Sequence, residues 1–205
     1  MTPRFPSDAN MAYSFESPAL TTGNAGPLAL GIVAAMKSDR NGTLRGALAS
    51  QKYNARDEFT AALIKALSAE GYAVVSVPVA RNDAGLLSTY PALHGTQNPD
   101  ALLDVDVTGY GFQILGAGYS GRCAPYLIMR TRLVNAQAPS TVLMQDTLAY
   151  GSSIPQKGTV AIPPVPEMGT LAHCFDELDE KPGPAVNDLR AASKASAEAV
   201  AKLLR

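Results

Sequence analysis

The segment Gly116-Ala-Gly-Tyr-Ser-Gly121 has the letters of a dinucleotide-binding loop, in which glycines let a pyrophosphate approach a helix N-terminus. That chemistry needs a strand before the loop and a helix that opens at its last glycine. The residues that follow, Arg122-Cys-Ala-Pro125, lead instead into a strand-like run. We therefore interpret the segment as a glycine-rich hairpin loop and predict no nucleotide cofactor.

Four aspartates could in principle gather around a hard cation, which prefers carboxylate oxygens: Asp100, Asp104, Asp106 and Asp146. Asp104 and Asp106 are two residues apart, and that is also the spacing of polar side chains on the solvent-facing side of a strand. We favour this second interpretation. A solvated strand face is predicted, with no metal site.

The two histidines, His94 and His173, lack the spacing of paired metal ligands. His173 precedes Cys174 directly, and neighbouring side chains on a helix point about 100° apart, so this imidazole is badly placed to activate the thiol. The chain has no Gly-x-Ser-x-Gly nucleophile elbow. The sequence therefore predicts no catalytic residue.

Cys123 and Cys174 are the only cysteines of the chain. In an oxidising compartment they would form one bridge, whereas in the cytosol they would be two small buried hydrophobic residues. Their number alone leaves both states open.

The 205 residues suit one domain with a sizeable core, and 46% of them are hydrophobic. The net charge of −1 implies no general attraction to nucleic acid or to anionic membranes. Residues 1–26 are rich in Pro, Ser, Thr, Asn and Gly, so they are predicted to be an irregular N-terminal tether before a single α/β domain at 27–205. The start of the chain lacks the pattern of a signal peptide, so the protein is expected either to be cytoplasmic or to have lost a targeting segment.

Three consecutive strands are predicted between Asp100 and Gly151, at 101–114, 126–134 and 141–150. In the first of them, apolar residues occupy odd positions up to Val107 and even positions from Tyr110 onward. Such a change of phase beside Gly109 and Gly111 predicts a β-bulge or a bend.

The elements around these strands complete an α/β (α+β) domain with a mixed or antiparallel sheet of about five strands. Two main helices, 54–70 and 185–204, are predicted to pack on one face of the sheet, the first through Phe59, Leu63 and Leu67. A short helix is predicted at 169–178, further strands at 28–36 and 72–79, and loops at 81–99 and 152–168.

The loop 81–99 contains four apolar residues that a solvated loop does not need: Leu86, Leu87, Tyr90 and Leu93. They would gain burial either against a partner protein or against the core of their own domain. We treat them as a candidate interface, with the second interpretation left open.

The order of these features resembles a group of bacterial envelope lipoproteins that includes the curli-secretion lipoprotein, the N-terminal domain of the Tol-system translocation protein and the lipoprotein activators of peptidoglycan synthases. The resemblance covers Leu28–Arg205 and rests on three stretches. The first is the strand predicted at 28–36, with the helix 54–70 and the following Glu-Gly-Tyr-Ala-Val-Val at 70–75. The second is Asp-Ala-Leu-Leu-Asp-Val-Asp-Val-Thr-Gly-Tyr-Gly at 100–111, and the third is the strand pair at 129–136 and 141–147.

This resemblance implies a non-enzymatic periplasmic domain that assists envelope assembly or transport through protein–protein contact. Its partner would be another envelope protein or a second copy of the chain, and neither nucleic acid nor a cofactor is expected. Contact with the outer membrane would come only through a lipid anchor, and the chain departs from the family in having no lipobox cysteine at its start. The envelope location also favours a bridge between Cys123, which enters a predicted strand, and Cys174, on a predicted helix.

Two other functions stay open at this point. The chain could be a small-molecule or lipid-binding auxiliary subunit of a transporter, with an apolar pocket closed by the loop 81–99. It could also be an enzyme whose site does not follow a recognised motif.

Overall fold

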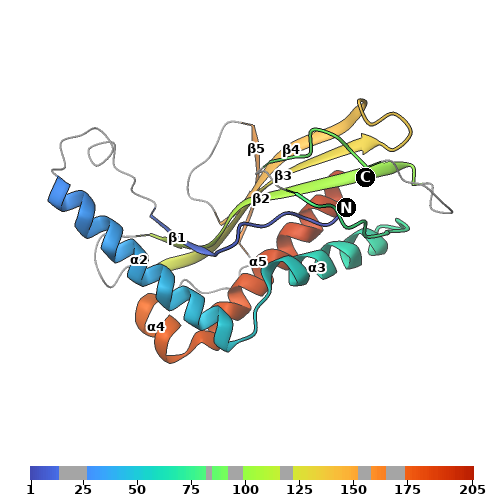
Figure 1. Ribbon diagram of the computed structural model, residues 1–205. Helices are drawn as coiled ribbons and strands as arrows, with labels where there is room; N and C mark the ends of the chain where they lie inside the picture. The colour runs from blue at the N-terminus through green and yellow to red at the C-terminus, as the bar shows by residue number, and fades with distance from the viewer. Residues whose placement is uncertain (14–26, 82–84, 92–98, 116–121, 152–157, 165–173) are drawn as a thin grey trace.

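The computed structural model describes residues 1–13, 27–81, 85–91, 99–115, 122–151, 158–164 and 174–205. Within these ranges the chain forms a five-stranded mixed sheet and four helices, which is an α+β fold. The helices lie along one face of the sheet (Figure 1). The predicted fold class is therefore confirmed, including the two main helices that pack on one face.

The sheet has the strand order β1-β2-β3-β4-β5, with β1 at Asn10–Tyr13, β2 at Ala101–Ile114, β3 at Cys123–Asn135, β4 at Val142–Tyr150 and β5 at Thr159–Ile162. The three central strands form an antiparallel meander, as predicted, and each edge strand runs parallel to its neighbour. The prediction of a loop over 152–168 is wrong for 159–162. This short strand ends at Ile162, directly before Pro163, which has no N–H to continue a ladder.

The predicted irregularity in β2 is confirmed, because its register with β3 shifts between Val107 and Gly109. The shift keeps Val107 before it and Tyr110 after it in the same apolar core. Gly111 has a φ of +137°, and a Cβ atom there would lie 2.1 Å from the backbone oxygen of Asn10. A glycine is thus required where β1 approaches β2.

Residues 1–13 lie along the outer edge of β2, which differs from the irregular tether predicted for 1–26. The Arg4 N–H donates to the Val105 carbonyl and the Arg4 carbonyl accepts from the Val107 N–H, so Arg4 pairs with Asp106 of β2. Strand β1 continues this pairing along β2. The ring of Phe5 makes edge contacts with Phe59 and Tyr110, each with centroids 5.6 Å apart. Because these contacts join residues distant in sequence, no local pattern could indicate them. Residues 14–26 lie outside the described part of the chain.

The first helix, α2 at Pro27–Ser50, replaces the strand predicted at 28–36. A short continuous apolar run has no period that distinguishes a buried strand from a helix, and Leu, Ala and Met favour the helix. Asn41, on this helix, accepts a hydrogen bond from the backbone N–H of Met11 at 2.9 Å.

The segment 72–79 is not a strand, contrary to the prediction. Residues 4–13 already occupy the adjoining edge of β2, and Pro78 has no N–H to donate to a ladder. The segment is held instead at Val77, whose carbonyl accepts a hydrogen bond from Thr2.

Helix α3, at Ala55–Ala69, begins and ends as the sequence predicts. Asn54 caps it by accepting a hydrogen bond from the N–H of Asp57, and Gly71 follows its end with a φ of +91°. Its stripe of Phe59, Leu63 and Leu67 is buried in the core, which confirms that prediction.

The C-terminal helices are α4 at Cys174–Glu180 and α5 at Pro182–Leu203. Small buried residues on α5, among them Ser193 and Ala197, let it lie close to α3. An ion pair between Arg190 and Glu58 joins α5 to α3, and Tyr53, which precedes α3, shares a hydrogen bond with Ser193 of α5. Among the helices that the structure describes, none is long and apolar enough to cross a membrane.

Candidate functional site

The sheet face opposite the helices carries charged residues in matching positions on β2 and β3. Asp104 pairs with Arg132 in the strand register, and Asp106 pairs with Arg130. Both aspartate side chains are fully buried, so the solvated strand face predicted for them is wrong. The reason is that the Arg4 side chain and residues 79–81 and 85–91 lie against this part of the sheet. We refer to Arg4, Arg81, Asp104, Asp106, Arg130 and Arg132 together as the arginine–aspartate layer.

Asp106 is held between two arginines. Its Oδ1 accepts a hydrogen bond from Arg4 Nη1 at 2.6 Å, and its Oδ2 accepts one from Arg130 Nη2 at 2.7 Å. Burial alone would raise the pKa of this carboxyl group, but the hydrogen bonds and positive charges of the two arginines outweigh burial and lower it. Asp106 is therefore ionised at neutral pH.

Asp104 connects residues 79–81 and 85–91 to the sheet. Its Oδ1 pairs with Arg81 Nη2, and its Oδ2 accepts a hydrogen bond from the backbone N–H of Leu87 at 2.7 Å. Arg132, on β3, also contacts Leu87. Its Nη1 donates to the Leu87 carbonyl at 3.3 Å, and its Nε donates to the Gln145 side chain at 2.7 Å. Leu87 is thus fixed by its backbone.

The arginine–aspartate layer contains four arginines and two aspartates, which leaves two positive charges in excess. Arg132 accounts for part of this excess, because among the described residues no carboxylate lies within ion-pair distance of it. A field of this sign in a partly buried region favours the approach of an anion.

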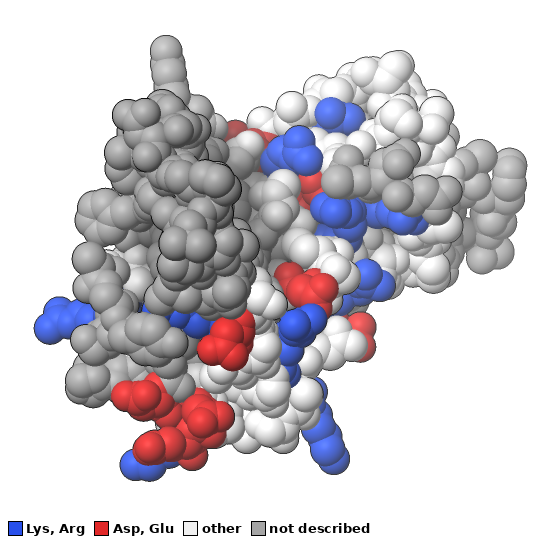
Figure 2. All heavy atoms as spheres, turned by 60° about the vertical axis from the view of Figure 1, so that its left-hand side comes forward, with Lys and Arg blue, Asp and Glu red and all other residues white. Residues whose placement is uncertain are grey.

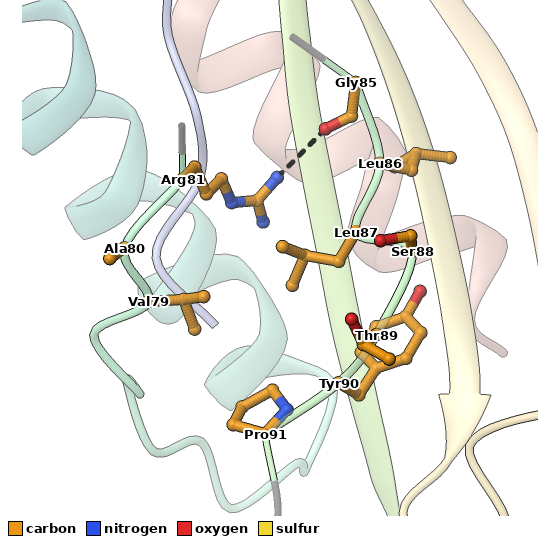
Figure 3. A pocket seen from close by; sticks show the side chains of 10 residues that line it. All are labelled: Val79, Ala80, Arg81, Gly85, Leu86, Leu87, Ser88, Thr89, Tyr90 and Pro91. Carbon is orange, nitrogen blue, oxygen red and sulfur yellow. Dashed lines mark hydrogen bonds between the residues drawn. The ribbon is translucent and has the colours of Figure 1, made fainter. Parts of the chain in front are cut away.

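A hollow of about 490 Å³ lies beside this layer, between the chain segments 79–81 and 85–91. Figure 3 shows these segments as facing walls, with the Arg81 side chain reaching between them toward the Gly85 carbonyl and the Leu87 side chain turned toward the same space. The hollow is lined by aliphatic, hydroxyl and guanidinium groups: Val79, Ala80, Arg81, Gly85, Leu86, Leu87, Ser88, Thr89, Tyr90 and Pro91.

Three of the four candidate interface residues line this hollow. Leu86, Leu87 and Tyr90 are each half-buried, so the structure brings them together at the surface without burying them in the core. Leu93 lies outside the described residues. The half-exposure of the three leaves apolar surface that a further contact would remove from water.

A second exposed apolar site lies at the start of β4. Val142 and Leu143 are 50% and 52% exposed. Within the described residues, β5 pairs only with Thr147–Tyr150, so the outer edge of β4 is open from Val142 to Asp146. Val142 pairs with Val134, which shares the face of Arg132, and thus lies on the same side of the sheet as the hollow.

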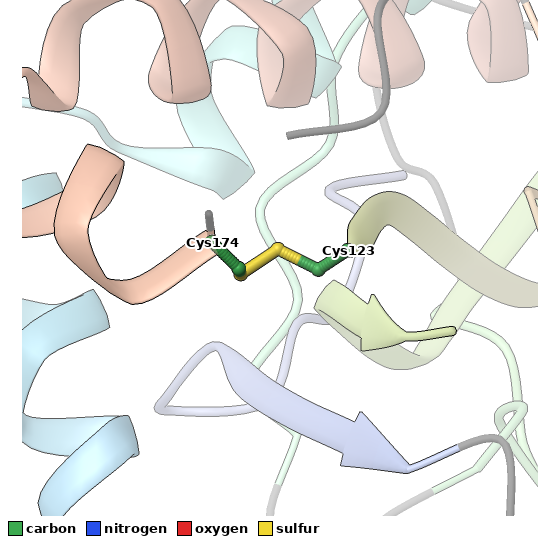
Figure 4. Close-up of a disulfide and its surroundings, with 2 residues drawn as sticks. All are labelled: Cys123 and Cys174. Atoms are coloured by element: carbon green, nitrogen blue, oxygen red, sulfur yellow. A yellow bond between two sulfur atoms is a disulfide. The ribbon is translucent and has the colours of Figure 1, made fainter. Parts of the chain in front are cut away.

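Cys123 and Cys174 form a disulfide with a Cα–Cα distance of 5.6 Å. It joins the first residue of β3 to the first residue of α4, and both side chains are fully buried (Figure 4). This pairing confirms the predicted bridge.

The remaining sequence motifs are the glycine-rich segment and the two histidines. The glycines 116–121 lie outside the described residues, but Leu115 donates a backbone hydrogen bond to Arg122 at 2.7 Å, and β3 follows directly. The segment therefore connects an antiparallel strand pair. His94 and His173 also lie outside the described part, and the described residues contain no cluster of His, Cys, Asp and Glu suited to a metal ion.

Charged side chains of both signs lie over the face seen in Figure 2. Acidic side chains gather at its lower end, at the level where Figure 1 places α4, whose sequence includes Asp176, Glu177, Asp179 and Glu180. Lys and Arg side chains are spread over both its upper and its lower half.

The arginine–aspartate layer is not among the sequence predictions, although part of its signal is present in the sequence. Asp104 and Asp106 alternate on one predicted strand, and Arg130 and Arg132 alternate on the next, so an antiparallel register could have matched them. Arg4 and Arg81 gave no such signal, because they reach the layer through long-range contacts.

Comparison of this chain with protein-family models, with curated proteins and with solved structures found no match.

Proposed function

We propose that this chain is a non-enzymatic periplasmic domain that assists envelope assembly or transport by contact with a protein partner. The observation that carries the proposal is the half-exposed apolar surface formed by Leu86, Leu87 and Tyr90, on the same side of the sheet as the open edge of β4. Leu, Tyr and Arg together have the composition of a contact surface, in which aromatic residues and arginine are enriched.

The way the segment 85–91 is attached supports this function. Its backbone is fixed by Asp104 and Arg132, so ordering it on binding would lose little conformational entropy. A surface held in place before the partner arrives binds more tightly than a loop that must be ordered.

The disulfide supports the proposed compartment. Disulfides persist in oxidising compartments such as the bacterial periplasm and are rare in the cytosol. The Cys123–Cys174 bridge is enclosed by the core, and it has the structural character expected of a secreted domain. In the proposed function, a lipid anchor holds the domain at the outer membrane.

The open edge of β4 extends the same contact surface. An exposed edge strand offers unpaired N–H and C=O groups to an extended segment of another chain. Val142 and Leu143 would supply the apolar contacts beside those hydrogen bonds. The partner on this edge would be either another envelope protein or a second copy of the chain.

Site-specific photo-crosslinking in the periplasm of a bacterial host, with crosslinkers at Leu86, Tyr90 and Val142, tests this function. We expect discrete adducts of one mass at these positions and none at Lys65, which is exposed on α3. The mass of the adduct distinguishes a second copy from a different protein. Adducts equally frequent at Lys65, or none at the three positions, would count against the proposal.

Substitution of Leu86, Leu87 and Tyr90 by Ser provides the stability control. If these residues form an interface, the adduct from Val142 is lost while the melting temperature stays nearly unchanged. A large fall in melting temperature would place them in the domain's own core and contradict the proposal.

The hollow favours a second candidate function, the small-molecule-binding auxiliary subunit of a transporter. Its volume of about 490 Å³ falls within the range of ligand pockets. Its mixture of hydroxyl, guanidinium and aliphatic groups suits a small polar ligand better than a lipid chain.

A further inference from the structure

A second hollow, of about 290 Å³, lies at the edge of the sheet where β1 begins beside the irregular part of β2. We call it the edge hollow. It is lined by residues 6–10, Asn41 of α2, residues 108–110 of β2 and Tyr126 of β3, none of which lines the hollow beside the arginine–aspartate layer. Its volume is close to the lower limit for ligand pockets, so it has room for one small ring.

Tyr126 presents a hydroxyl group to the edge hollow. The residue is only 6% exposed, yet this hydroxyl makes no hydrogen bond with any described residue and retains accessible surface. A Cβ atom on Gly109 would lie 3.6 Å from the hydroxyl oxygen, so the hydroxyl lies beside this glycine, which also lines the hollow. Polar groups on buried side chains are nearly always paired, so a group bound here would complete the pairing of Tyr126.

The Tyr126 hydroxyl is neutral at physiological pH. Burial raises the pKa of Tyr126 to about 12, and the nearby Tyr110 adds to this rise. The hydroxyl therefore keeps its proton, and it can both donate and accept a hydrogen bond.

Two further neutral groups of the edge hollow have hydrogen-bonding capacity left. Asn10 Oδ1 accepts from the Asn41 amide at 3.3 Å, which leaves the Asn10 NH₂ group as a donor. Thr108 Oγ1 donates to the Ile128 carbonyl at 3.2 Å, and its oxygen remains an acceptor. The edge hollow thus offers neutral donors and acceptors side by side.

The charge of the edge hollow favours a neutral ligand. Among the described residues that line it none is Lys or Arg, and its one carboxylate, on Asp8, is 58% exposed. Asp8 Oδ1 lies 4.0 Å from Arg45 Nη1, which partly balances this charge. An anion would be repelled by Asp8, and a cation would compete with Arg45.

An extended peptide is also disfavoured, because the adjoining strand edge is closed. The Met11 N–H of β1 donates to Asn41 Oδ1 at 2.9 Å, so it is not open to a further strand. The ligand class that remains is a small neutral molecule with several hydrogen-bonding groups.

We propose that the edge hollow binds one ring of a saccharide. The Tyr126 hydroxyl, the Asn10 amide and the Thr108 hydroxyl pair with hydroxyl groups at different positions of the ring, each of which can also donate and accept. These three groups need not converge on one atom, because a sugar carries its hydroxyl groups around its edge. The half-buried Pro6 supplies apolar contact for the C–H groups of the ring. This inference goes beyond the proposed protein contact and does not depend on it.

Amide chemical-shift titration of the whole chain tests the proposal. The probes are D-glucose, D-galactose and D-mannose, with three molecules of similar size for comparison: tetrahydropyran-2-methanol, cyclohexanecarboxylate and cyclohexylammonium. We expect at least one hexose to shift the amides of Asn10, Thr108 and Gly109 saturably. Tetrahydropyran-2-methanol keeps the ring and has one hydroxyl group, so it should bind at least tenfold more weakly than that hexose.

Tyr126→Phe removes the hydroxyl and keeps the ring. The affinity for the hexose should fall by roughly two- to tenfold, because one hydrogen bond between neutral groups is lost. The melting temperature should stay nearly unchanged, because the hydroxyl has no partner among the described residues. Tyr72→Phe is the matched control for binding, since the Tyr72 hydroxyl donates to the Leu204 carbonyl on another part of the surface.

Gly109→Ala gives a second, independent variant. Its Cβ atom would lie 3.4 Å from a Tyr126 ring carbon and 3.6 Å from the hydroxyl, so it would occupy the space beside the hydroxyl. Hexose binding should weaken again, and an unchanged spectrum away from the edge hollow shows that the variant is folded.

Four results would overturn the proposal: no saturable shift with any of the three hexoses up to about 50 mM, equal binding of tetrahydropyran-2-methanol, tighter binding of either charged probe, or wild-type affinity in Tyr126→Phe. A clear fall in the melting temperature of Tyr126→Phe would also overturn it, since the hydroxyl would then have a partner in the protein. Crosslinking at Leu86, Tyr90 and Val142 reports on other residues, so the two proposals fail separately.

Discussion

The two faces of the sheet are covered in different ways. On one face, α3 and α5 bury an apolar layer in which Phe59, Leu63 and Val200 are almost wholly removed from water. On the other, residues 79–81 and 85–91, which form neither helix nor strand, lie over two buried aspartates and the arginines around them. Apolar packing is non-directional and tolerates small adjustments, whereas each ion pair specifies which atoms meet.

This difference bears on what each face contributes. Burying charges costs solvation free energy, so an ion pair adds little net stability but is costly to break. We interpret the arginine–aspartate layer as the set of contacts that fixes the position of residues 79–81 and 85–91 on the sheet. The helix-covered face supplies most of the stabilisation through apolar burial.

Asp104→Ala, on the charged face of the sheet, should have the largest effect on the free energy of unfolding. It leaves the almost fully buried Arg81 without its carboxylate and the Leu87 N–H without its acceptor. The expected loss in the free energy of unfolding is about 3–5 kcal/mol, measured by urea denaturation. Asp106→Ala should cost less, because Arg130 is 46% exposed and can reach water. Asp100→Ala, at an exposed position, is the control. Equal effects of all three would show that the layer does not hold the segment.

Reduction of the disulfide tests the helix-covered side of the molecule. The bridge closes a loop with a sequence separation of 51, and in the chain-entropy model its loss costs roughly 4 kcal/mol. Urea denaturation with and without a reductant measures the difference on one sequence. The free energy of unfolding of the double variant Cys123→Ala/Cys174→Ala should be the same with and without the reductant. Two free thiols in the denatured, unreduced protein would contradict the bridge.

Leu63→Ala examines the apolar layer directly. Leu63 is 5% exposed on the buried stripe of α3, so its truncation should lower the free energy of unfolding by roughly 2–5 kcal/mol. Lys65→Ala, on the exposed side of the same helix, should change it by less than about 0.5 kcal/mol. A change at Leu63 as small as that at Lys65 would mean that α3 does not pack as described.

Lowering the pH should reduce the stabilising contribution of the charged face of the sheet before that of the helix-covered face. The folded-state pKa of Asp106 is lowered, so its stabilising contribution is complete above the unfolded-state pKa of about 3.9 and is lost as the pH falls through the folded value. Between pH 5 and pH 2 we expect the wild type to lose more stability than Asp106→Asn, which cannot titrate. Parallel stability curves for the two proteins would contradict this role of the arginine pairs.

The parts of the fold that sequence analysis predicts are those governed by local pattern. Alternation indicates the meander, a helical stripe and its cap indicate α3, and the change of phase at Gly109 indicates the bulge. The run at 28–36 lacks a period, so helix and strand could not be separated there.

The parts that it does not predict depend on partners far along the chain. Residues 10–13 form a strand only because β2 offers an edge and Gly111 leaves room for it. Asp104 and Asp106 have the alternation of a solvated face, and only the arrival of Arg4 and Arg81 buries them. The candidate interface residues were found from composition, since apolar side chains in a loop require a reason.

The pairing of β1 with β2 also has a consequence in time. Arg4 and Asp106 are separated by 102 positions, so a chain that emerges with its N-terminus first, from a ribosome or from an export channel, presents the first well before the second. During that interval the leading segment has no edge to join. Any factor that binds extended chains has that interval to capture it.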